Sequence, residues 1–220
     1  MAIQLYNSNY KKLLLKQLLK WNSIPTAVIS DSMNRQNVMA SRISALLPGK
    51  MVGQARTVSV IAGDNGAIHA SMNLLGSNDV LVIDGGAYKE RALWGGILNT
   101  LAIQRNISGV VIDGAIRDID ELIGMGLPIF FSSVTPAGPH KGWGGTIGTQ
   151  VSCGGVSVSP SDIVVGDGDG VVIIPIQQAP RVLQAALTRL RFEEMLIKKI
   201  KLGEDLTGVF DYPKIEAINN

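Results

Sequence analysis

The chain has 220 residues, of which 46% are hydrophobic and 17% are charged, so intrinsic disorder is excluded as its main state. Its 20 Lys and Arg residues nearly balance its 18 Asp and Glu residues, and only 5% of the residues are aromatic. Those proportions argue against a nucleic-acid-binding surface, which needs clustered positive charge or base-stacking rings. The leucine-rich stretch Leu13–Leu19 contains Lys16 and is too short to span a membrane.

The scarcity of cysteine and histidine limits the kinds of metal site that the chain can build. There is one cysteine, Cys153, and there are two histidines, His69 and His140. An intrachain disulfide is impossible, and the chain fits a reducing, cytoplasmic compartment. A thiolate cage or a multi-histidine site is excluded as well. Any metal would be held mainly by oxygen atoms, which favours Mg²⁺ or Mn²⁺.

The N-terminal third predicts helices followed by a strand and a further helix. Leucines on one stripe and lysines on another indicate an amphipathic first helix, and Pro25 suits the start of a second. The expected elements are helices over residues 9–21 and 26–33, a strand over 51–61, and a helix around 68–75.

The middle of the chain alternates short apolar strands with helices. The strands are expected over residues 80–83, 110–112 and 129–132, and the helices over 90–104 and 118–125. Fully apolar strands that alternate with helices are typical of parallel βαβ units. Right-handed crossovers then place the loops that follow the strands along one edge of the sheet.

The C-terminal part combines an irregular stretch, a hairpin and one long helix. Residues 135–155 are rich in Gly and Pro without clear periodicity, and long irregular stretches are often functional. A hairpin is expected with strands 163–165 and 171–174, then a helix over 177–202 and an irregular tail. The sequence shows neither a repeat nor a linker, so we expect residues 1–220 to form one α/β domain. Its parts are the N-terminal helices (1–45), a core (50–175), and the C-terminal helix and tail (176–220).

Two groups of residues that each follow an expected strand could carry chemistry. Glycines let a ligand approach the backbone, and free N–H groups at the start of a helix can receive a carboxylate. Arg117 offers a bidentate fork, while Asp118 and Glu121 share one face of a helix and suit a hard cation. The first group is Gly95, Gly96, Ile97 and Leu98, and the second is Arg117, Asp118 and Glu121.

These groups fit the binding of a small 2-oxo acid and one divalent ion. A simpler interpretation is also open, in which Arg117 and its acidic neighbours form a surface ion-pair set at the start of a helix. In that case Gly95-Gly96 would only allow tight helix packing. Spacing alone favours the simpler interpretation.

The chain resembles the RraA-like family, which includes 4-hydroxy-4-methyl-2-oxoglutarate aldolases and regulators of ribonuclease E. The resemblance extends from about Ile24 to Pro175. The stretches that carry it are Gly53–Val58, Gly63–Asn65, Asp79–Gly86, Ala92–Gly95, Gly109–Asp118, Gly126–Pro128 and Asp169–Val172.

The resemblance implies a β/β/α swivelling-type (phosphohistidine-domain-like) fold assembled as homotrimers or hexamers, with active sites between subunits. It implies that Arg117 binds substrate, that Asp118 holds Mg²⁺ or Mn²⁺, and that the backbone of Gly95–Leu98 receives a pyruvyl carboxylate. Acidic residues of a neighbouring subunit are expected to complete the site, and Asp31 and Glu193 are the matches in this sequence.

The sequence departs from the aldolases of the family at Gly96, where they carry an aspartate. The pattern Gly96-x20-Arg117-Asp118-x2-Glu121 resembles relatives associated with metal-dependent oxaloacetate decarboxylation. The predicted activity is a lyase that forms a pyruvate enolate, by decarboxylation or by aldol cleavage. The alternatives are a non-catalytic regulator that binds a ribonuclease or another protein, and a methyltransferase. The methyltransferase would need the Gly-x-Gly-x-x-Gly spacing, which is absent after Val80–Gly86.

Overall fold

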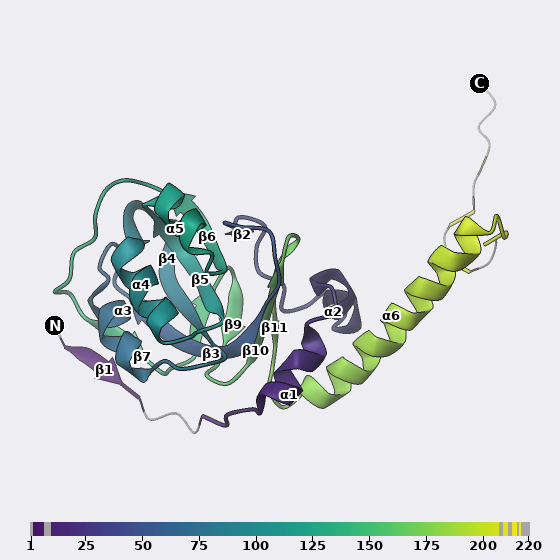
Figure 1. Ribbon diagram of the computed structural model, residues 1–220, viewed down its shortest axis with the longest axis horizontal. Coiled ribbons are helices and arrows are strands. Elements are labelled where there is room, and N and C mark those ends of the chain that lie inside the picture. The colour runs from purple at the N-terminus through teal and green to yellow at the C-terminus, as the bar shows by residue number, and fades with distance from the viewer. Residues whose placement is uncertain (1, 7–9, 207–208, 211–212, 215, 217–220) are drawn as a thin grey trace.

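The computed structural model of the chain describes residues 2–6, 10–206, 209–210, 213–214 and 216. Within these residues a mixed sheet runs in the order β1-β7-β3-β4-β5-β6-β2, and the β10–β11 hairpin joins it at β3 (Figure 1). Its strands are β1 (Ile3–Leu5), β2 (Ser44–Ala45), β3 (Met51–Val60), β4 (Asp79–Trp94), β5 (Gly109–Ile116), β6 (Ile129–Val134), β7 (Gly145–Ile147), β10 (Ile163–Asp167) and β11 (Gly170–Ile174). A separate hairpin consists of β8 (Val151–Cys153) and β9 (Val156–Val158).

Helices pack on one face of the central strands and on the β10–β11 hairpin. None in the described part of the chain has the length and apolar character needed to cross a membrane. They are α1 (Leu15–Leu18) with the 3₁₀ turn η1 (Leu19–Trp21), α2 (Thr26–Ser32), α3 (Gly66–Ser71) with η2 (Met72–Leu74), α4 (Gly96–Gln104), α5 (Ile119–Met125) and α6 (Ala179–Lys201).

The four central strands β3, β4, β5 and β6 are parallel, which confirms the predicted βαβ units. All eight residues of β5 are buried, because helices lie over one face of the sheet and the β8–β9 hairpin lies over the other. A strand buried on both faces reads as a continuous apolar run, and this explains why the sequence pattern identified these strands.

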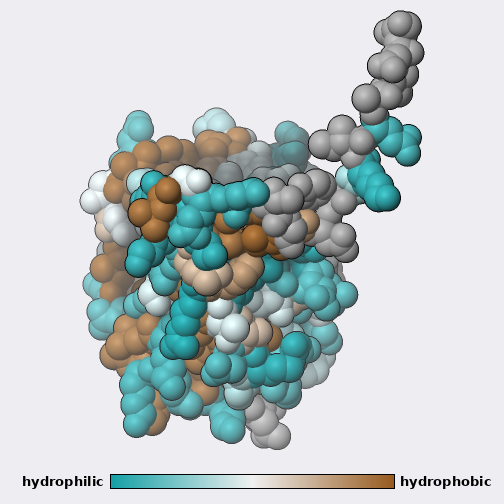
Figure 2. Space-filling view, turned by 90° about the vertical axis from the view of Figure 1, so that its right-hand side faces the viewer, coloured by the Kyte–Doolittle hydropathy of each residue, from teal (hydrophilic) through white to brown (hydrophobic). Residues whose placement is uncertain are grey.

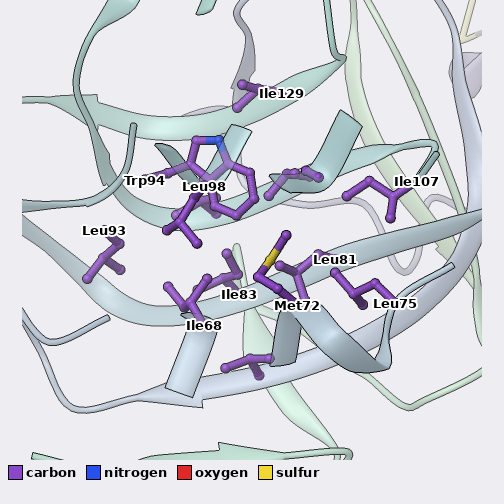
Figure 3. Packing of buried hydrophobic residues seen from close by; sticks show 14 of the residues in the cluster. Ile68, Met72, Leu75, Leu81, Ile83, Leu93, Trp94, Leu98, Ile107 and Ile129 are labelled. Carbon is purple, nitrogen blue, oxygen red and sulfur yellow. The ribbon is translucent and has the colours of Figure 1, made fainter. Parts of the chain in front are cut away.

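Three hydrophobic clusters hold the layers together. The first lies between the sheet and helices α3, α4 and α5, where Trp94, Leu98 and Ile83 meet (Figure 3). The second lies on the opposite face, under β8 and β9. The third joins α1, α2 and α6 to the β10–β11 hairpin. Each fully buried Leu, Ile or Phe side chain contributes about 1.5–3 kcal/mol, so these clusters fix the frame on which the candidate site is built.

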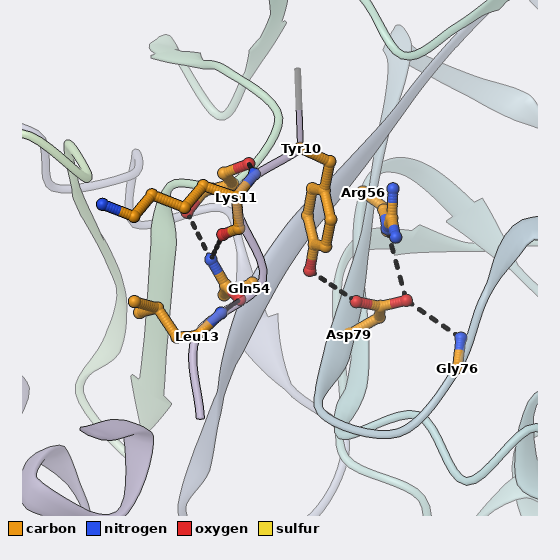
Figure 4. Close-up of polar contacts among 8 residues, drawn as sticks. Tyr10, Lys11, Leu13, Gln54, Arg56, Gly76 and Asp79 are labelled. Atoms are coloured by element: carbon orange, nitrogen blue, oxygen red, sulfur yellow. Dashed lines mark hydrogen bonds and ion pairs between the residues drawn. The ribbon is translucent and has the colours of Figure 1, made fainter. Parts of the chain in front are cut away.

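The predicted first helix over residues 9–21 is wrong in its first half. Asn9 lies outside the described residues, and the helical turns begin only at Leu15. The segment before them is held by the side chain of Gln54, which accepts from Leu13 N–H at 2.7 Å and donates to the carbonyl of Lys11 at 3.0 Å (Figure 4). Because the backbone of this segment bonds across the fold, it cannot form the bonds of a helix.

Two further predictions are corrected in the middle of the chain. Residues 90–94 continue strand β4 and are not helical, since helix α4 starts at Gly96. Register shifts between β4 and β5 after Asp84, together with positive φ angles at Gly86 and Ala87, carry the chain to Trp94 in an extended form. The stretch 135–155, expected to be irregular, contains β7 and β8.

The C-terminal hairpin and long helix are confirmed within a few residues. Helix α6 starts against α1 and α2 and then extends away from the body of the molecule (Figure 1). Its far half exposes apolar side chains, among them Phe192, Met195, Ile197 and Ile200. Figure 2 shows hydrophobic side chains among hydrophilic ones on the face of the molecule that lies on this side.

Candidate active site

Arg117 and Asp118 lie at the junction between strand β5 and helix α5. The N–H of Arg117 donates to the carbonyl of Trp94 at 3.0 Å, so β5 stays tied to the end of β4 up to this residue. Asp118 then takes a left-handed conformation, with φ 61° and ψ 39°, and becomes the N-cap of α5. A non-glycine residue in this region is held there by its surroundings at a cost of about 1–3 kcal/mol. Such strain is typical of functional positions.

The side chain of Asp118 accepts a hydrogen bond from the neighbouring helix α4 and makes no capping hydrogen bond to its own helix α5. Its Oδ2 accepts a hydrogen bond from the N–H of Gly96 at 3.0 Å and lies 3.6 Å from Nε of Arg117. Gly96 is the first residue of α4, whose first-turn N–H groups have no partner within the helix. The guanidinium, the carboxylate and the start of α4 therefore converge at one point.

Two glycines make this convergence possible. A β-carbon on Gly95 would lie 2.5 Å from Oδ2 of Asp118, and one on Gly96 would lie 2.5 Å from Oε1 of Glu121. Those distances are far shorter than any ordinary carbon–oxygen contact. The carboxylates of Asp118 and Glu121 occupy the space that side chains at positions 95 and 96 would need.

These residues border a small pocket. It lies between α3, the end of β4, the start of α4 and the loop between β6 and β7. The residues that line it are Asn65, His69, Ala92, Leu93, Trp94, Gly95, Gly96, Ile97, Leu98, Arg117, Asp118, Pro139 and Lys141. With Arg117 and Lys141 in its wall, the pocket is suited to an anion.

Asn65 and His69 add neutral polar groups to the pocket wall. Asn65 is 4% exposed and donates from Nδ2 to the carbonyl of Leu93 at 3.0 Å, while its buried Oδ1 has no hydrogen-bond partner among the described residues. Burial, together with the charge of Lys141, lowers the pKa of His69. His69 is therefore neutral at pH 7, since the ordinary pKa of histidine is about 6.5.

The donor set fits a divalent cation that keeps part of its water shell. The described residues contain no cluster of three or more His, Cys, Asp and Glu side chains that could enclose a metal. Asp118 and Glu121 nevertheless bring two carboxylates to the start of α4. Mg²⁺ is usually bound by one or two carboxylates plus water and substrate oxygens. The residues present thus fit Mg²⁺ or Mn²⁺ and fit neither a thiolate nor a histidine site.

Asp31 and Glu193 lie elsewhere in the fold. Asp31 is on α2 and Glu193 is on α6, at the opposite side of the molecule from α4 and α5 (Figure 1). Arg189 joins them, with its Nη2 2.5 Å from Oδ2 of Asp31 and its Nε 2.9 Å from Oε1 of Glu193. The two acids are thus brought together, but within one chain they do not reach Arg117 and Asp118.

Seven of the residues that line the pocket were not candidate site residues in the sequence: Asn65, His69, Ala92, Leu93, Trp94, Pro139 and Lys141. Of the two histidines, His69 lines the pocket, whereas His140 stacks on Trp143 with ring centroids 4.3 Å apart and is not among the lining residues. The available signal was the irregular stretch after β6, whose Gly and Pro content indicated a functional loop without showing which of its side chains turn inward.

Comparisons with known proteins agree with this architecture. The profile of the RraA-like family, described as Aldolase/RraA, matches residues 26–173. A protein of Halalkalibacterium halodurans named "Putative 4-hydroxy-4-methyl-2-oxoglutarate aldolase" is 40% identical over 170 residues, which cover 77% of this chain and 81% of that protein.

Two solved structures share the fold. An uncharacterized protein from Pseudomonas syringae pv. tomato superposes with a TM-score of 0.79 at 26% identity, covering 92% of this chain and 96% of that one. Streptomyces coelicolor RraAS2, described as an unusual member of the RNase ES inhibitor RraA protein family, superposes with a TM-score of 0.76 at 25% identity. That match covers 84% of this chain and 98% of RraAS2.

Proposed function

Because the chain belongs to the RraA-like family, we propose that it is a divalent-metal-dependent carbon–carbon lyase that acts on small 2-oxo acids through a pyruvate enolate. The observation that carries this proposal is the meeting of Arg117, Asp118 and the first turn of α4 in one pocket. A cation, a metal-binding carboxylate and free backbone N–H groups are the parts that an enolate-forming site needs.

The substrate carboxylate is assigned to the N–H groups at the start of α4, where Ile97 and Leu98 lie. Arg117 donates to the oxygen on C2 of the substrate and stabilises the negative charge that develops there. Asp118 and Glu121 are the residues assigned to hold Mg²⁺ or Mn²⁺, which when bound supplies Lewis-acid polarisation of the C2 carbonyl.

In oxaloacetate decarboxylation the C3–C4 bond breaks and CO₂ leaves. The electron pair of that bond forms the C2=C3 double bond, and the π pair of the C2 carbonyl moves onto the C2 oxygen beside Arg117. A proton from solvent then adds to C3 and gives pyruvate. Aldol cleavage of a 4-hydroxy-2-oxo acid gives the same enolate but also needs a base for the C4 hydroxyl proton. Gly96 supplies no carboxylate for that step, which favours decarboxylation over aldol cleavage.

We further propose that the active form is a homotrimer or a hexamer in which a neighbouring copy supplies Asp31 and Glu193. The exposed apolar residues on the far half of α6 support an assembled form, because such a surface is typical of an interface. We also propose that the chain has the swivelling-type fold that the resemblance to the family implies. Light scattering after size exclusion would measure the assembly directly.

The test of the activity is pyruvate formation from oxaloacetate with Mg²⁺ or Mn²⁺, with and without chelator, after subtraction of the reaction catalysed by free metal. Wild type is compared with Arg117→Ala and Asp118→Ala. Activity that depends on the protein and is lost in both variants supports the proposal. Wild type and both variants all at the metal-only background would overturn it.

The second candidate is a regulator that binds a ribonuclease, which the similarity to RraAS2 favours. The two candidates differ in what Asp118 does. Loss of metal affinity in Asp118→Ala supports the enzyme, whereas ribonuclease binding by a protein without metal affinity supports the regulator.

A further inference from the structure

The loop over residues 135–144, between β6 and β7, is a fixed wall of the candidate site. Backbone and side-chain groups of two other segments, residues 63–65 and strand β4, anchor it along its length. The anchoring bonds are Ala92 N–H to Ala137 O at 2.8 Å, His140 N–H to Gly63 O at 2.8 Å, Asn65 N–H to His140 O at 2.9 Å, and Trp143 N–H to Asp64 Oδ2 at 2.9 Å. With this many bonds the loop has a defined position relative to α3 and β4.

Gly138 is the point at which this loop meets the guanidinium of Arg117. A β-carbon on Gly138 would lie 2.9 Å from Nη1 and 4.0 Å from Cζ of Arg117. Apart from its chain neighbours, it would meet no other described residue within 4 Å. The φ angle of Gly138 lies outside the left-handed region. The backbone therefore does not require glycine here, and the space taken by Arg117 does.

Arg117 is confined on a second side by Gly95. A β-carbon on Gly95 would lie 3.1 Å from Cγ and 3.3 Å from Nε of Arg117, besides its contact with Asp118. The side chain of Arg117 thus runs between two glycines from different elements, Gly95 near its Cγ and Nε and Gly138 near its tip.

The Gly138 peptide is itself held by a second arginine. Nη1 of Arg91, on strand β4, donates to the carbonyl of Gly138 at 3.1 Å. Arg91 in turn packs beside Gly63, where a β-carbon would lie 3.2 Å from its Cδ. Arg91 therefore connects the strand that ends at the pocket to the part of the loop that touches Arg117.

We propose that Gly138 and Arg91 are positioning residues that fix where the guanidinium of Arg117 points. The inference rests on the proposed function, because it gives Arg117 the role of binding the substrate. A misplacement of about 1 Å at a reacting group can lower a rate about 100-fold. Arg117 has a side chain 39% exposed, so it can turn toward solvent when a methyl group is added at position 138. The expected effect is on function and not on folding.

The experiment compares Gly138→Ala with Gly142→Ala, a matched control in the same loop. Apart from its chain neighbours, no residue in the described part of the chain lies within 4 Å of a β-carbon on Gly142, and the φ of Gly142 is not left-handed. The probe is oxalate, a planar dianion that resembles pyruvate enolate, titrated calorimetrically with Mn²⁺ present. Gly138→Ala is expected to weaken oxalate binding and to lower kcat for oxaloacetate at least 10-fold, while its Tm and that of Gly142→Ala stay near wild type.

Coupling to Arg117 separates positioning from a general structural role. In an Arg117→Ala background, Gly138→Ala is expected to have no further effect on oxalate binding. Arg91→Met is expected to resemble Gly138→Ala, and Arg91→Lys, which can still donate to a carbonyl, should recover part of the loss. Equal loss with and without Arg117, or oxalate binding and kcat of Gly138→Ala equal to those of an active wild type, would overturn the inference.

A third readout needs no ligand. The Nε–H resonance of Arg117, identified by its absence in Arg117→Ala, is expected to shift in Gly138→Ala and to stay in place in Gly142→Ala. An unchanged resonance in Gly138→Ala refutes the positioning role. If wild type neither binds oxalate nor forms pyruvate above background, the proposed function is refuted. The positioning role is still tested in that case, because the Nε–H resonance reports where Arg117 lies.

Discussion

The carboxylate of Asp118 accepts a hydrogen bond from the backbone N–H of Gly96 at 3.0 Å, joining the start of α5 to the start of α4. Both residues depart from ordinary local preference. Asp118 is left-handed without being glycine, and Gly96 is a glycine at the first position of a helix. Each departure brings the carboxylate and the helix terminus together, which is the arrangement that the proposed site requires.

Asp118→Asn is expected to keep the fold and lose the activity. Asparagine tolerates the left-handed conformation and its Oδ1 can still accept from Gly96, so the free energy of unfolding should change by less than about 1 kcal/mol. Loss of the negative charge should lower metal affinity and oxaloacetate decarboxylation by about 100-fold or more. Urea denaturation, Mn²⁺ titration and a decarboxylation assay check these outcomes. Metal affinity equal to wild type would remove Asp118 from the metal site.

Gly96→Ala is expected to lower activity by displacing the carboxylate of Glu121. The β-carbon of Gly96→Ala would meet Oε1 of Glu121, an exposed side chain that can move away, so the loss of stability should be small. Moving that carboxylate should lower decarboxylation about 10-fold or more, within the range seen when groups around a metal are disturbed. In a Glu121→Ala background the same substitution should cost nothing more. Independent effects of the two substitutions would show that Glu121 is not part of the site.

The acid stability of the protein should depend on Asp167. Burial would raise its pKa, but hydrogen bonds from Thr26 and Lys50 outweigh burial and hold the pKa below its ordinary value. A lowered pKa in the folded state means that its stabilisation is complete above about pH 4, the unfolded value, and is lost as pH falls through the folded value. Asp167→Asn should therefore cost about 1–3 kcal/mol at pH 7 and progressively less below pH 4.

Urea unfolding at several pH values measures this difference, and Asp169→Asn, at the exposed tip of the same hairpin, is the matched control. A stability difference between wild type and Asp167→Asn that does not shrink in acid would contradict the assignment.

The N-terminal segment should depend on Asp79, which is 1% exposed. Its carboxylate accepts from Tyr10 Oη at 2.6 Å, from Arg56 Nε at 3.3 Å and from Gly76 N–H at 2.9 Å (Figure 4). Removing one partner of a buried charge pair costs about 3–5 kcal/mol, so Asp79→Ala should be strongly destabilising. Tyr10→Phe removes one hydrogen bond and should cost about 1 kcal/mol. Urea unfolding gives the denaturant midpoint of each variant. Equal midpoints for Asp79→Ala and Tyr10→Phe would contradict this ranking.

The parallel core could be predicted from sequence because its signal is local. Strand β5 is buried on both faces, so its run of Val and Ile residues carries the information by itself. Arg117 and Asp118 could also be located, since they follow that run directly. The resemblance to a family, and not their spacing, turned them from a surface ion pair into a candidate site.

The remaining features depend on contacts between distant segments. Residues 10–14 look helical, yet the side chain of Gln54 binds their backbone. Residues 90–94 also look helical, yet Ala92 N–H bonds to the carbonyl of Ala137 in the loop after β6. Asn65 and Lys141 line the same pocket because that loop, which carries Lys141, lies beside Asn65. The sequence pattern around either residue does not predict that the two are close.

If the pocket at Arg117 and Asp118 forms a pyruvate enolate, the methyl protons of pyruvate should exchange with deuterium in D₂O. NMR measures this exchange after Mn²⁺ has been removed from the sample. Exchange requires the enolate whether the physiological reaction is decarboxylation or aldol cleavage. We expect exchange well above the metal-only rate for wild type and Gly142→Ala, and loss of that exchange in Arg117→Ala and Asp118→Asn. Exchange at the metal-only rate in wild type, or equal exchange in all four proteins, would contradict it.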